Sequence, residues 1–341
     1  MTPSTSTDYY DYEYNVTPIS PCNTYSINYL GAQLSTLYYV MFVFSLFGNG
    51  LVFVIIHRFQ KLTSVTNIFL LNLVLSSLIF TSSLPFWGVY QQLSNWIFGT
   101  TMCKIVGSVY FLGFYSSVLF LTLLTFDRHV AVVYPLAASQ VRRRSYAIVS
   151  CAVVWLVSLL ACIKPMILYR PFTFLGNTVF CDEYYNIDSI NASHLRSAGF
   201  YLQLFIFFLF PLAIILYCYI RITIAVVLSK IATKFKTVRL VFIIVLLFFA
   251  CWTPFNIVLL TYDNVSTCDK VQRMGYALQV TRTIAYVYFC ISPIFYTFVG
   301  KKFQNYFRLL LVKHFPGLTS FVTVSHTTRS TTTKMATSPV Y

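Results

Sequence analysis

Ionisable and nucleophilic side chains are scarce in this 341-residue chain, and their spacing indicates binding rather than catalysis. The chain has nine Asp and Glu, 24 Lys and Arg, five His and nine Cys. A nucleophile, a general base and a group that orients the base are not found together, and no Cys-x-x-Cys or Cys/His spacing indicates a metal site. We therefore expect no enzymatic activity, no cofactor and no bound metal.

The most acidic segment, residues 8–14, reads Asp-Tyr-Tyr-Asp-Tyr-Glu-Tyr. Acids interleaved with tyrosines favour tyrosine sulfation, which would add further negative charge. Such a segment would attract and hold a basic protein electrostatically, whereas the alternative is a solvated, glycosylated segment without a binding role. The residues expected to bind are Tyr9, Tyr10, Asp11, Tyr12, Glu13 and Tyr14.

Arg282 is a second residue that indicates binding, because residues 283–300, which follow it, contain no charged side chain. A cation inside a membrane span costs about 2.5–3.5 kcal/mol on insertion scales, and less near the end of the span. We expect Arg282 to meet an acid or a carbonyl of a ligand, or to pair with an acid of an outer loop. The alternative is that its side chain extends toward the lipid headgroups.

The elements that position these residues are seven stretches of at least 18 residues without Asp, Glu, Lys or Arg. A helix needs about 20 such residues to cross a hydrocarbon core of about 30 Å. The connections are too short for a soluble domain, so the sequence predicts an all-α bundle of seven transmembrane helices. The stretches are 14–57, 62–103, 105–126, 145–163, 197–220, 240–262 and 283–300.

The distribution of charge predicts the orientation. With the N-terminus outside, 17 Lys and Arg and one acid face the cytoplasm, and seven Lys and Arg and eight acids face outward, which sums to the net charge of +15. This agrees with the positive-inside rule. Because the orientation in the membrane accounts for the basic excess, we expect no nucleic-acid partner. The glycosylation sequons at Asn15, Asn191 and Asn264 all fall outside, and the C-terminus falls inside.

Four cysteines lie on the outer side of the membrane in this orientation, namely Cys22, Cys103, Cys181 and Cys268. Four cysteines allow three pairings, and the residues alone do not choose among them. One of these pairings joins Cys103 to Cys181 and Cys22 to Cys268, which would connect the third span to the second outer loop and the N-terminal segment to the third outer loop.

The chain therefore divides into an outer acidic, Tyr-rich segment at 1–32, the bundle at 33–300 and two cytoplasmic segments. Residues 301–315 place Phe303, Phe307 and Leu311 on one helical face and basic residues off it. We expect an amphipathic helix there that lies on anionic membrane lipid. Residues 316–341 are rich in Ser and Thr, and we expect them to be disordered and open to phosphorylation; a solvated tail without a role is the alternative.

Landmark residues in successive spans resemble the class A, rhodopsin-like G-protein-coupled receptors. They occur in family order over nearly the whole chain: Gly48-Asn49, Leu71-Asn72-Leu73, Cys103, Asp127-Arg128-His129, Trp155, Pro165, Pro211, Tyr219, Cys251-Trp252-Thr253-Pro254, Pro293 and Tyr296. Within that family the chain resembles a chemokine receptor. The segments that carry this closer resemblance are 83–87 (SLPFW), 96–99 (WIFG), 114–117 (FYSS) and 294–300 (IFYTFVG).

The resemblance implies a plasma-membrane receptor for a small basic chemokine, coupled to a heterotrimeric G protein of the Gi type. It also implies that arrestin and receptor kinases act on the Ser/Thr-rich tail, and it supports the Cys103–Cys181 and Cys22–Cys268 pairings. The implied ligand pocket contains Tyr38, Trp87, Tyr90, Tyr110, Phe255, Tyr262, Arg282 and Tyr286.

The resemblance further implies an activation switch at the inner half of the bundle. Pairing of Asp127 with Arg128 would hold the inactive state, and release of Arg128 would open a cavity for the G protein. Tyr219 and Tyr296 would support the open form. A kink beside Trp252 would let the inner end of the sixth span swing. The prolines of this switch are Pro254 and Pro293.

Several residues depart from the pattern of the family. Ser77 stands where the family has a sodium-binding Asp, and Ser292 stands where it has an Asn before Pro293. We therefore expect sodium regulation to be lost and basal activity to differ, with a preference for raised activity. Arg282 replaces a common Glu, as in the receptor for lymphotactin (the XC chemokine). Such departures are similar to those of viral homologues, so a receptor that scavenges chemokine without G-protein signalling is the competing reading.

Overall fold

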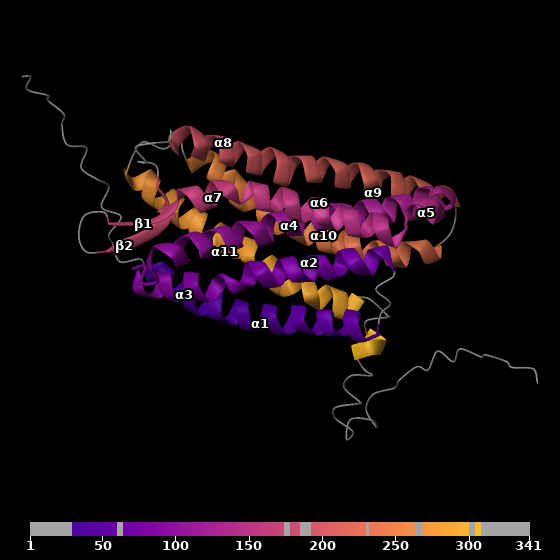
Figure 1. Cartoon of the computed structure of the whole chain (residues 1–341), viewed down its shortest axis with the longest axis horizontal. Coiled ribbons are helices and arrows are strands. Elements are labelled where there is room, and N and C mark those ends of the chain that lie inside the picture. Colours follow the sequence, from indigo (N-terminus) through magenta and orange to yellow (C-terminus); the bar gives the residue numbers. More distant parts are fainter. Residues whose placement is uncertain are drawn as a thin grey trace, which may run out of the picture.

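The chain forms a bundle of long, roughly antiparallel helices (Figure 1). The computed structural model describes residues 29–59, 64–173, 178–184, 192–229, 232–262, 268–299 and 304–307. The N-terminal acidic segment, the sequons, Cys22 and the Ser/Thr-rich tail lie outside these residues. Of the expected amphipathic helix, only residues 304–307 are described, and they are helical.

Within the described residues, seven helical units run along the bundle. Six of them contain a segment that is long and apolar enough to cross a membrane, and α11, whose first half carries several charged residues, completes the bundle. The units are α1 (Tyr29–Phe59), α2 (Val65–Ser82) with α3 (Leu84–Leu93), α4 (Gly99–Val133), α6 (Arg144–Ala161) with α7 (Ile163–Leu168), α8 (Ala192–Leu204) with the π-helix η1 (Phe205–Leu209) and α9 (Phe210–Ser229), α10 (Ala232–Tyr262) and α11 (Cys268–Val299). A short helix, α5 (Pro135–Val141), connects α4 to α6.

Prolines lie at or near several irregular points of these units. Pro85 lies in the first turn of α3, directly after the break at Ser83, and Pro211 follows the π-helical turn η1. Because proline has no N–H to donate and clashes with the preceding turn, it breaks or kinks a helix at these places. Pro254 and Pro293 lie inside α10 and α11.

A two-stranded antiparallel hairpin, which the sequence did not predict, lies at one end of the bundle. Strand β1 (Tyr169–Thr173) pairs with β2 (Val179–Glu183). A disulfide joins Cys103 of α4 to Cys181 of β2, which is the pairing that the sequence analysis expected. The all-α bundle is confirmed, and the hairpin is a small addition to it.

The connection between α3 and α4, residues 94–98, also holds the hairpin in place. The Trp96 backbone N–H donates to the Val179 carbonyl at 2.8 Å, and the Val179 N–H donates to the Asn95 side-chain oxygen at 2.7 Å. We call this end, which carries α3, β1 and β2, the hairpin end. The opposite end, which carries α5 (Figure 1) and the last turns of α4 with Arg128, is the Arg128 end.

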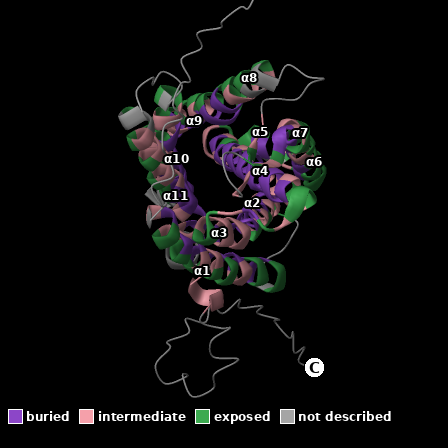
Figure 2. Ribbon diagram, turned by 90° about the vertical axis from the view of Figure 1, so that its left-hand side faces the viewer, coloured by how far each residue is buried: buried purple, intermediate pink, exposed green. Residues whose placement is uncertain are grey.

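Buried residues face the inside of the bundle, and exposed residues face outward (Figure 2). Many of the exposed ones are large and apolar, for example Phe47, Leu156 and Val227, as expected where the solvent is lipid. Helix α4 carries the largest share of the buried residues. It approaches α2 so closely at Gly113 that a Cβ atom there would lie 2.5 Å from the Phe80 backbone nitrogen.

Candidate functional site

An aromatic cluster near the hairpin end brings together three of the predicted pocket residues. Tyr38 of α1, Tyr110 of α4 and Tyr286 of α11 meet with ring centroids of 5.7 Å (Tyr38 to Tyr286) and 5.6 Å (Tyr110 to Tyr286). Phe80 of α2 fills the space between them, 5.1 Å from Tyr110 and 5.2 Å from Tyr286. Phe80 was missed at the sequence level, since one apolar residue in an apolar span carries no distinguishing signal.

A second cluster contains the two predicted residues of α3. Trp87 lies 6.0 Å from Tyr90, 5.9 Å from Trp96 and 6.4 Å from Tyr169, measured between ring centroids. Its buried indole N–H has no acceptor among the described residues. Burial raises the pKa of Tyr169 well above its ordinary value, and its hydroxyl therefore stays neutral and able to donate.

Arg282 of α11 connects these clusters electrostatically. Its guanidinium lies 5.9 Å from the centroid of the Phe255 ring. It interacts electrostatically with Tyr286, Tyr110, Tyr169 and Asp182, but among the described residues no carboxylate lies within 4 Å of it. A cation surrounded by neutral hydroxyls and rings, without an ion-pair partner in the described part of the chain, is suited to bind an anionic or carbonyl oxygen.

One cation near these clusters is neutralised by an ion pair. Lys164 of α7 forms an ion pair with Glu183 of β2, and both side chains are largely buried. The Lys164 ammonium also lies 5.7 Å from the centroid of the Phe111 ring. Nothing in the sequence marked this pair, because the two residues become neighbours only when the hairpin folds back over α7.

The side chain of Tyr262 and residues 8–14 of the predicted binding surface, and the side chain of Cys268 of the predicted Cys22–Cys268 disulfide, fall outside the described part of the structure. Tyr262 is the last residue of α10, and Cys268 is the first residue of α11. The structure therefore brings together Tyr38, Trp87, Tyr90, Tyr110, Phe255, Arg282 and Tyr286 around the hairpin end.

At the Arg128 end, a polar network surrounds the buried carboxylate of Asp127. Arg142, at the end of α5, donates to it twice, from Nε to Oδ1 at 2.7 Å and from Nη2 to Oδ2 at 2.9 Å. Thr66 of α2 donates to Oδ2 at 2.8 Å and accepts from Arg128. The expected contact of Arg128 with Asp127 is present but longer, at 3.7 Å. Arg142 was missed because 142–144 are three arginines that the sequence does not distinguish.

The remaining switch residues are distributed along the bundle, and Tyr219 packs with Val132 and Val133 against Ile222 and Val226 near the Arg128 end. Trp252 of α10 stacks on Phe114 of α4 with ring centroids 4.0 Å apart. Tyr219 of α9 packs against Phe242 of α10, with ring centroids 4.9 Å apart. Pro254 and Pro293 are placed within their helices as expected, whereas the side chain of Tyr296 lies outside the described residues.

The central polar residues offer only neutral donors at the two positions where the resemblance implied a sodium site. The Ser77 hydroxyl donates to the Leu73 carbonyl at 3.0 Å, and Ser292 is buried. Asn49 donates to the carbonyls of Ser45 and Phe289 at 3.1 Å each. Hard cations in proteins are usually bound by carboxylates together with neutral oxygens, so Ser77 and Ser292 do not fit a sodium ion well.

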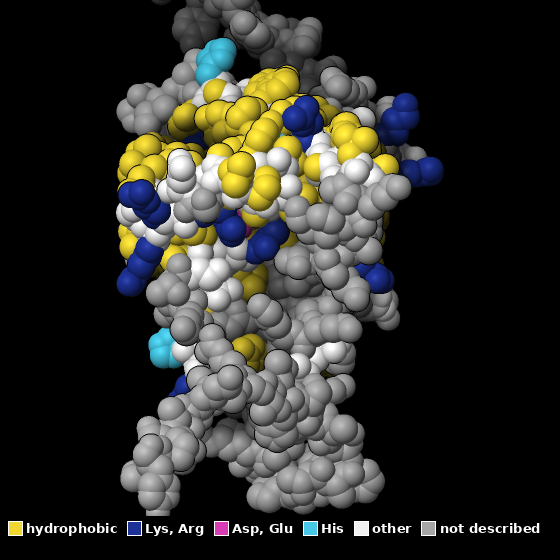
Figure 3. Space-filling view, turned by 90° about the vertical axis from the view of Figure 1, so that its right-hand side faces the viewer, with side chains coloured by type: hydrophobic (Ala, Val, Ile, Leu, Met, Phe, Trp, Pro, Cys, Tyr) yellow, Lys and Arg dark blue, Asp and Glu magenta, His cyan; other side chains and the backbone are white. Residues whose placement is uncertain are grey.

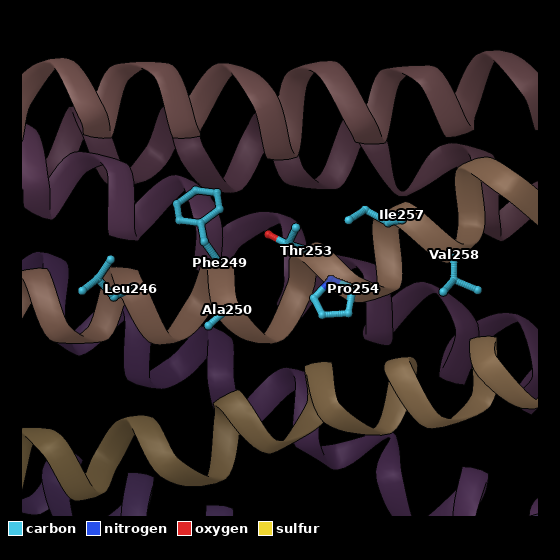
Figure 4. A pocket seen from close by; sticks show the side chains of 7 residues that line it. All are labelled: Leu246, Phe249, Ala250, Thr253, Pro254, Ile257 and Val258. Atoms are coloured by element: carbon cyan, nitrogen blue, oxygen red, sulfur yellow. The ribbon is translucent and has the colours of Figure 1, made fainter.

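A groove of about 680 Å³ runs along α10 beside Pro254 (Figure 4). Thr253 is its one polar side chain, and all of its lining residues belong to α10: Leu246, Phe249, Ala250, Thr253, Pro254, Ile257 and Val258. None of the predicted binding residues lines it, so this groove is distinct from the aromatic clusters.

Comparison with known proteins gives a consistent result. Residues 48–296 match the family described as 7 transmembrane receptor (rhodopsin family). The chain is 36% identical over 311 residues to C-C chemokine receptor type 3 of Cavia porcellus, covering 89% of this chain and 85% of that receptor. It is 34% identical over 318 residues to C-C chemokine receptor type 1 of Homo sapiens (91% and 88%). It is 35% identical over 316 residues to the human type 8 receptor (91% and 87%).

Proposed function

Since the chain belongs to the chemokine receptors of the rhodopsin family, we propose that it binds a chemokine at the hairpin end and activates a heterotrimeric G protein at the Arg128 end. Membership of this family also means that the chain is not an enzyme. The G protein is of the Gi type, and the receptor acts at the plasma membrane.

The observation that carries this proposal is that a cluster of polar side chains lies near each end of one helical bundle. Arg282, among tyrosine hydroxyls, supports ligand binding at one end. The Asp127–Arg128–Arg142 network supports a switch at the other. Binding at one end that changes the equilibrium at the other is a coupling free energy between two sites.

Aromatic contacts connect the two regions. Phe80, which touches Tyr110 and Tyr286, stacks on Phe289 with ring centroids 3.8 Å apart. Phe289 in turn lies 6.4 Å from Trp252, centroid to centroid. A ligand that displaces Tyr286 or Phe80 would therefore move rings that pack against the part of α10 that contains Trp252 and Pro254. This contiguity supports coupling, and mutation must test it.

The hairpin end faces the outside of the cell in this proposal, and the Arg128 end faces the cytoplasm. The disulfide at the hairpin end suits an oxidising compartment. Lys and Arg side chains gather on the opposite face (Figure 3), as the positive-inside rule requires.

Exposed apolar residues at the Arg128 end favour a protein partner there. Leu136 of α5 is 87% exposed, and it lies only a few residues beyond Arg128 in the chain. Burial of such a leucine by a G protein would contribute about 1.5–3 kcal/mol.

The decisive experiment measures chemokine binding and G-protein activation in the same cells over a panel of chemokines. We expect at least one chemokine to bind and to stimulate nucleotide exchange on Gi, and Arg128→Ala to abolish exchange while binding remains. A chemokine that binds and is internalised without any exchange would instead favour the scavenging receptor. Exchange measured without chemokine, against untransfected cells, tests the expected raised basal activity.

A further inference from the structure

The ion pair of Lys164 and Glu183 connects several elements at the hairpin end (Figure 1). The Lys164 ammonium of α7 donates to the Glu183 carboxylate of β2, and the two side chains are only 15% and 13% exposed. The aliphatic part of Lys164 passes α8 at Gly199, where an added Cβ atom would lie 2.7 Å from Cε of the lysine. The ammonium also lies 5.7 Å from the centroid of the Phe111 ring of α4. Lys164 thus contacts α4, α8 and β2 at once.

This ion pair is the second attachment of strand β2 to the bundle. The first is the disulfide between Cys181 and Cys103 of α4. Successive side chains of a strand point to opposite faces, so Cys181 and Glu183 share the face that meets the helices, whereas Asp182 between them is exposed. A strand that is attached at one residue can still turn about that residue. The ion pair, two residues further along, removes this freedom.

The ion pair also determines where Tyr169 of β1 lies. Glu183 is the direct partner of Tyr169 in the antiparallel register of the hairpin, and directly opposite residues share one face of a strand pair. The Tyr169 ring lies against α4 at Gly107, where an added Cβ atom would be 2.6 Å from the ring. Its centroid is 6.2 Å from that of Phe111, the ring that also faces Lys164.

Tyr169 meets the ligand site through two of its predicted residues. Its ring centroid lies 6.4 Å from that of Trp87, and it interacts electrostatically with Arg282. A tyrosine hydroxyl can donate or accept a hydrogen bond. Tyr169 can therefore bind polar atoms of a ligand that meets Arg282.

We propose that Lys164 and Glu183 are positioning residues for the ligand site: their ion pair holds Tyr169 beside Trp87 and Arg282, and Tyr169 contacts the ligand. The pair acts on ligand affinity through Tyr169, not through a contact of its own. The inference deepens the proposed function and rests on it in assigning chemokine binding to the hairpin end.

A role in positioning can be separated from a role in stability. A buried ion pair can often be replaced by apolar side chains of similar size without loss of stability. An ion pair that only stabilised the fold could therefore be replaced by Met and Leu with no effect on ligand binding. One that fixes the orientation of a strand could not, because apolar side chains have no directional contact to replace it.

The test uses the purified full-length receptor and three measurements: thermal unfolding, affinity for the chemokine identified by the panel, and hydrogen exchange of residues 169–184 without chemokine. The test variant is Lys164→Met with Glu183→Leu, and Lys164→Arg keeps the charge. Arg170→Gln is the matched control, since it removes an exposed cation from the same hairpin.

We expect the Met and Leu variant to unfold within about 2 °C of wild type but to bind chemokine at least tenfold more weakly. Its hairpin amides should exchange at least tenfold faster, because exchange reports local opening of the strand pair. Lys164→Arg and Arg170→Gln should stay within threefold of wild type in affinity and in exchange.

A second comparison tests the route through Tyr169. Tyr169→Phe should weaken binding at least threefold in wild type and should add no further loss in the Met and Leu variant, because the ring is already displaced there. Additive losses would overturn the role of Tyr169.

Three other results would overturn the proposal: wild-type affinity in the Met and Leu variant, an equal loss in Arg170→Gln, or a loss of affinity without faster exchange. The last result would mean that Lys164 or Glu183 contacts the chemokine directly. If no chemokine binds the wild-type receptor, the proposed function fails. The exchange measurement needs no chemokine, and unchanged exchange in the Met and Leu variant would by itself refute the positioning role.

Discussion

Arg142 holds the carboxylate of Asp127 through two hydrogen bonds, at 2.7 and 2.9 Å, while Arg128 remains 3.7 Å away. Asp127 therefore contacts not only the adjacent Arg128 but also Arg142, which lies in the connection between α4 and α6. The carboxylate is fully buried, whereas the Arg142 side chain is 26% exposed. Arg142 thus makes the closest charged contacts with the Asp127 carboxylate.

Arg142→Gln should lower the stability of the resting receptor by about 2 kcal/mol. The substitution leaves a buried carboxylate without its closest cation. Removing one partner of a buried ion pair costs more free energy than the intact pair contributes to stability, because the remaining charge is left uncompensated. Thermal unfolding of the purified protein measures the loss. Arg143→Gln removes the same charge one residue away, where the side chain is exposed, and should change stability by less than about 0.5 kcal/mol. Equal effects of the two substitutions would contradict the role given to Arg142.

Substitutions of Arg282 should weaken chemokine binding in the order Lys, Gln, Glu. Lysine keeps the charge but loses the planar set of donors, glutamine loses the charge, and glutamate replaces attraction by repulsion. We expect Arg282→Glu to bind at least tenfold more weakly, which corresponds to about 1.4 kcal/mol. Competition binding with the chemokine identified by the panel measures the series. If Gln and Glu bind equally well, Arg282 acts through packing alone.

The sequence predicted the spans because lipid demands long uncharged stretches, and this demand is local in the chain. Arg282 could be singled out for the same reason, because it is a charged residue directly beside a long uncharged stretch. What the sequence could not show depends on tertiary contacts. Arg142 differs from Arg143 and Arg144 only because the end of α5 places it beside Asp127. Lys164 and Glu183 meet only through the hairpin, whose strands are five residues each and too short to give a clear pattern.

Sodium should have no effect on chemokine affinity. Ser77 and Ser292 supply neutral hydroxyls where a carboxylate would be needed, so a sodium ion gains too little to offset its dehydration. Replacing NaCl by KCl at equal ionic strength should change the measured affinity by less than a factor of two. Ser77→Asp restores the carboxylate and should make thermal stability higher in NaCl than in KCl. A sodium effect in the unmodified receptor as large as that in Ser77→Asp would show that other residues hold the ion.

Gly113→Ala should destabilise the bundle, because no space exists for a methyl group at this crossing. The added Cβ would lie 2.5 Å from the Phe80 backbone nitrogen and 2.6 Å from its Cα, and backbone atoms cannot rotate away as a flexible side chain can. Helices α2 and α4 must therefore separate, which costs about 1–3 kcal/mol and disturbs the stacking of Phe80 on Phe289. Gly50→Ala is the matched control, since nothing lies within 4 Å of a Cβ atom there and alanine is the better helix former. Thermal unfolding should show a loss for Gly113→Ala and none for Gly50→Ala. If both variants are as stable as wild type, the close approach of α2 and α4 at this point is not required by the fold.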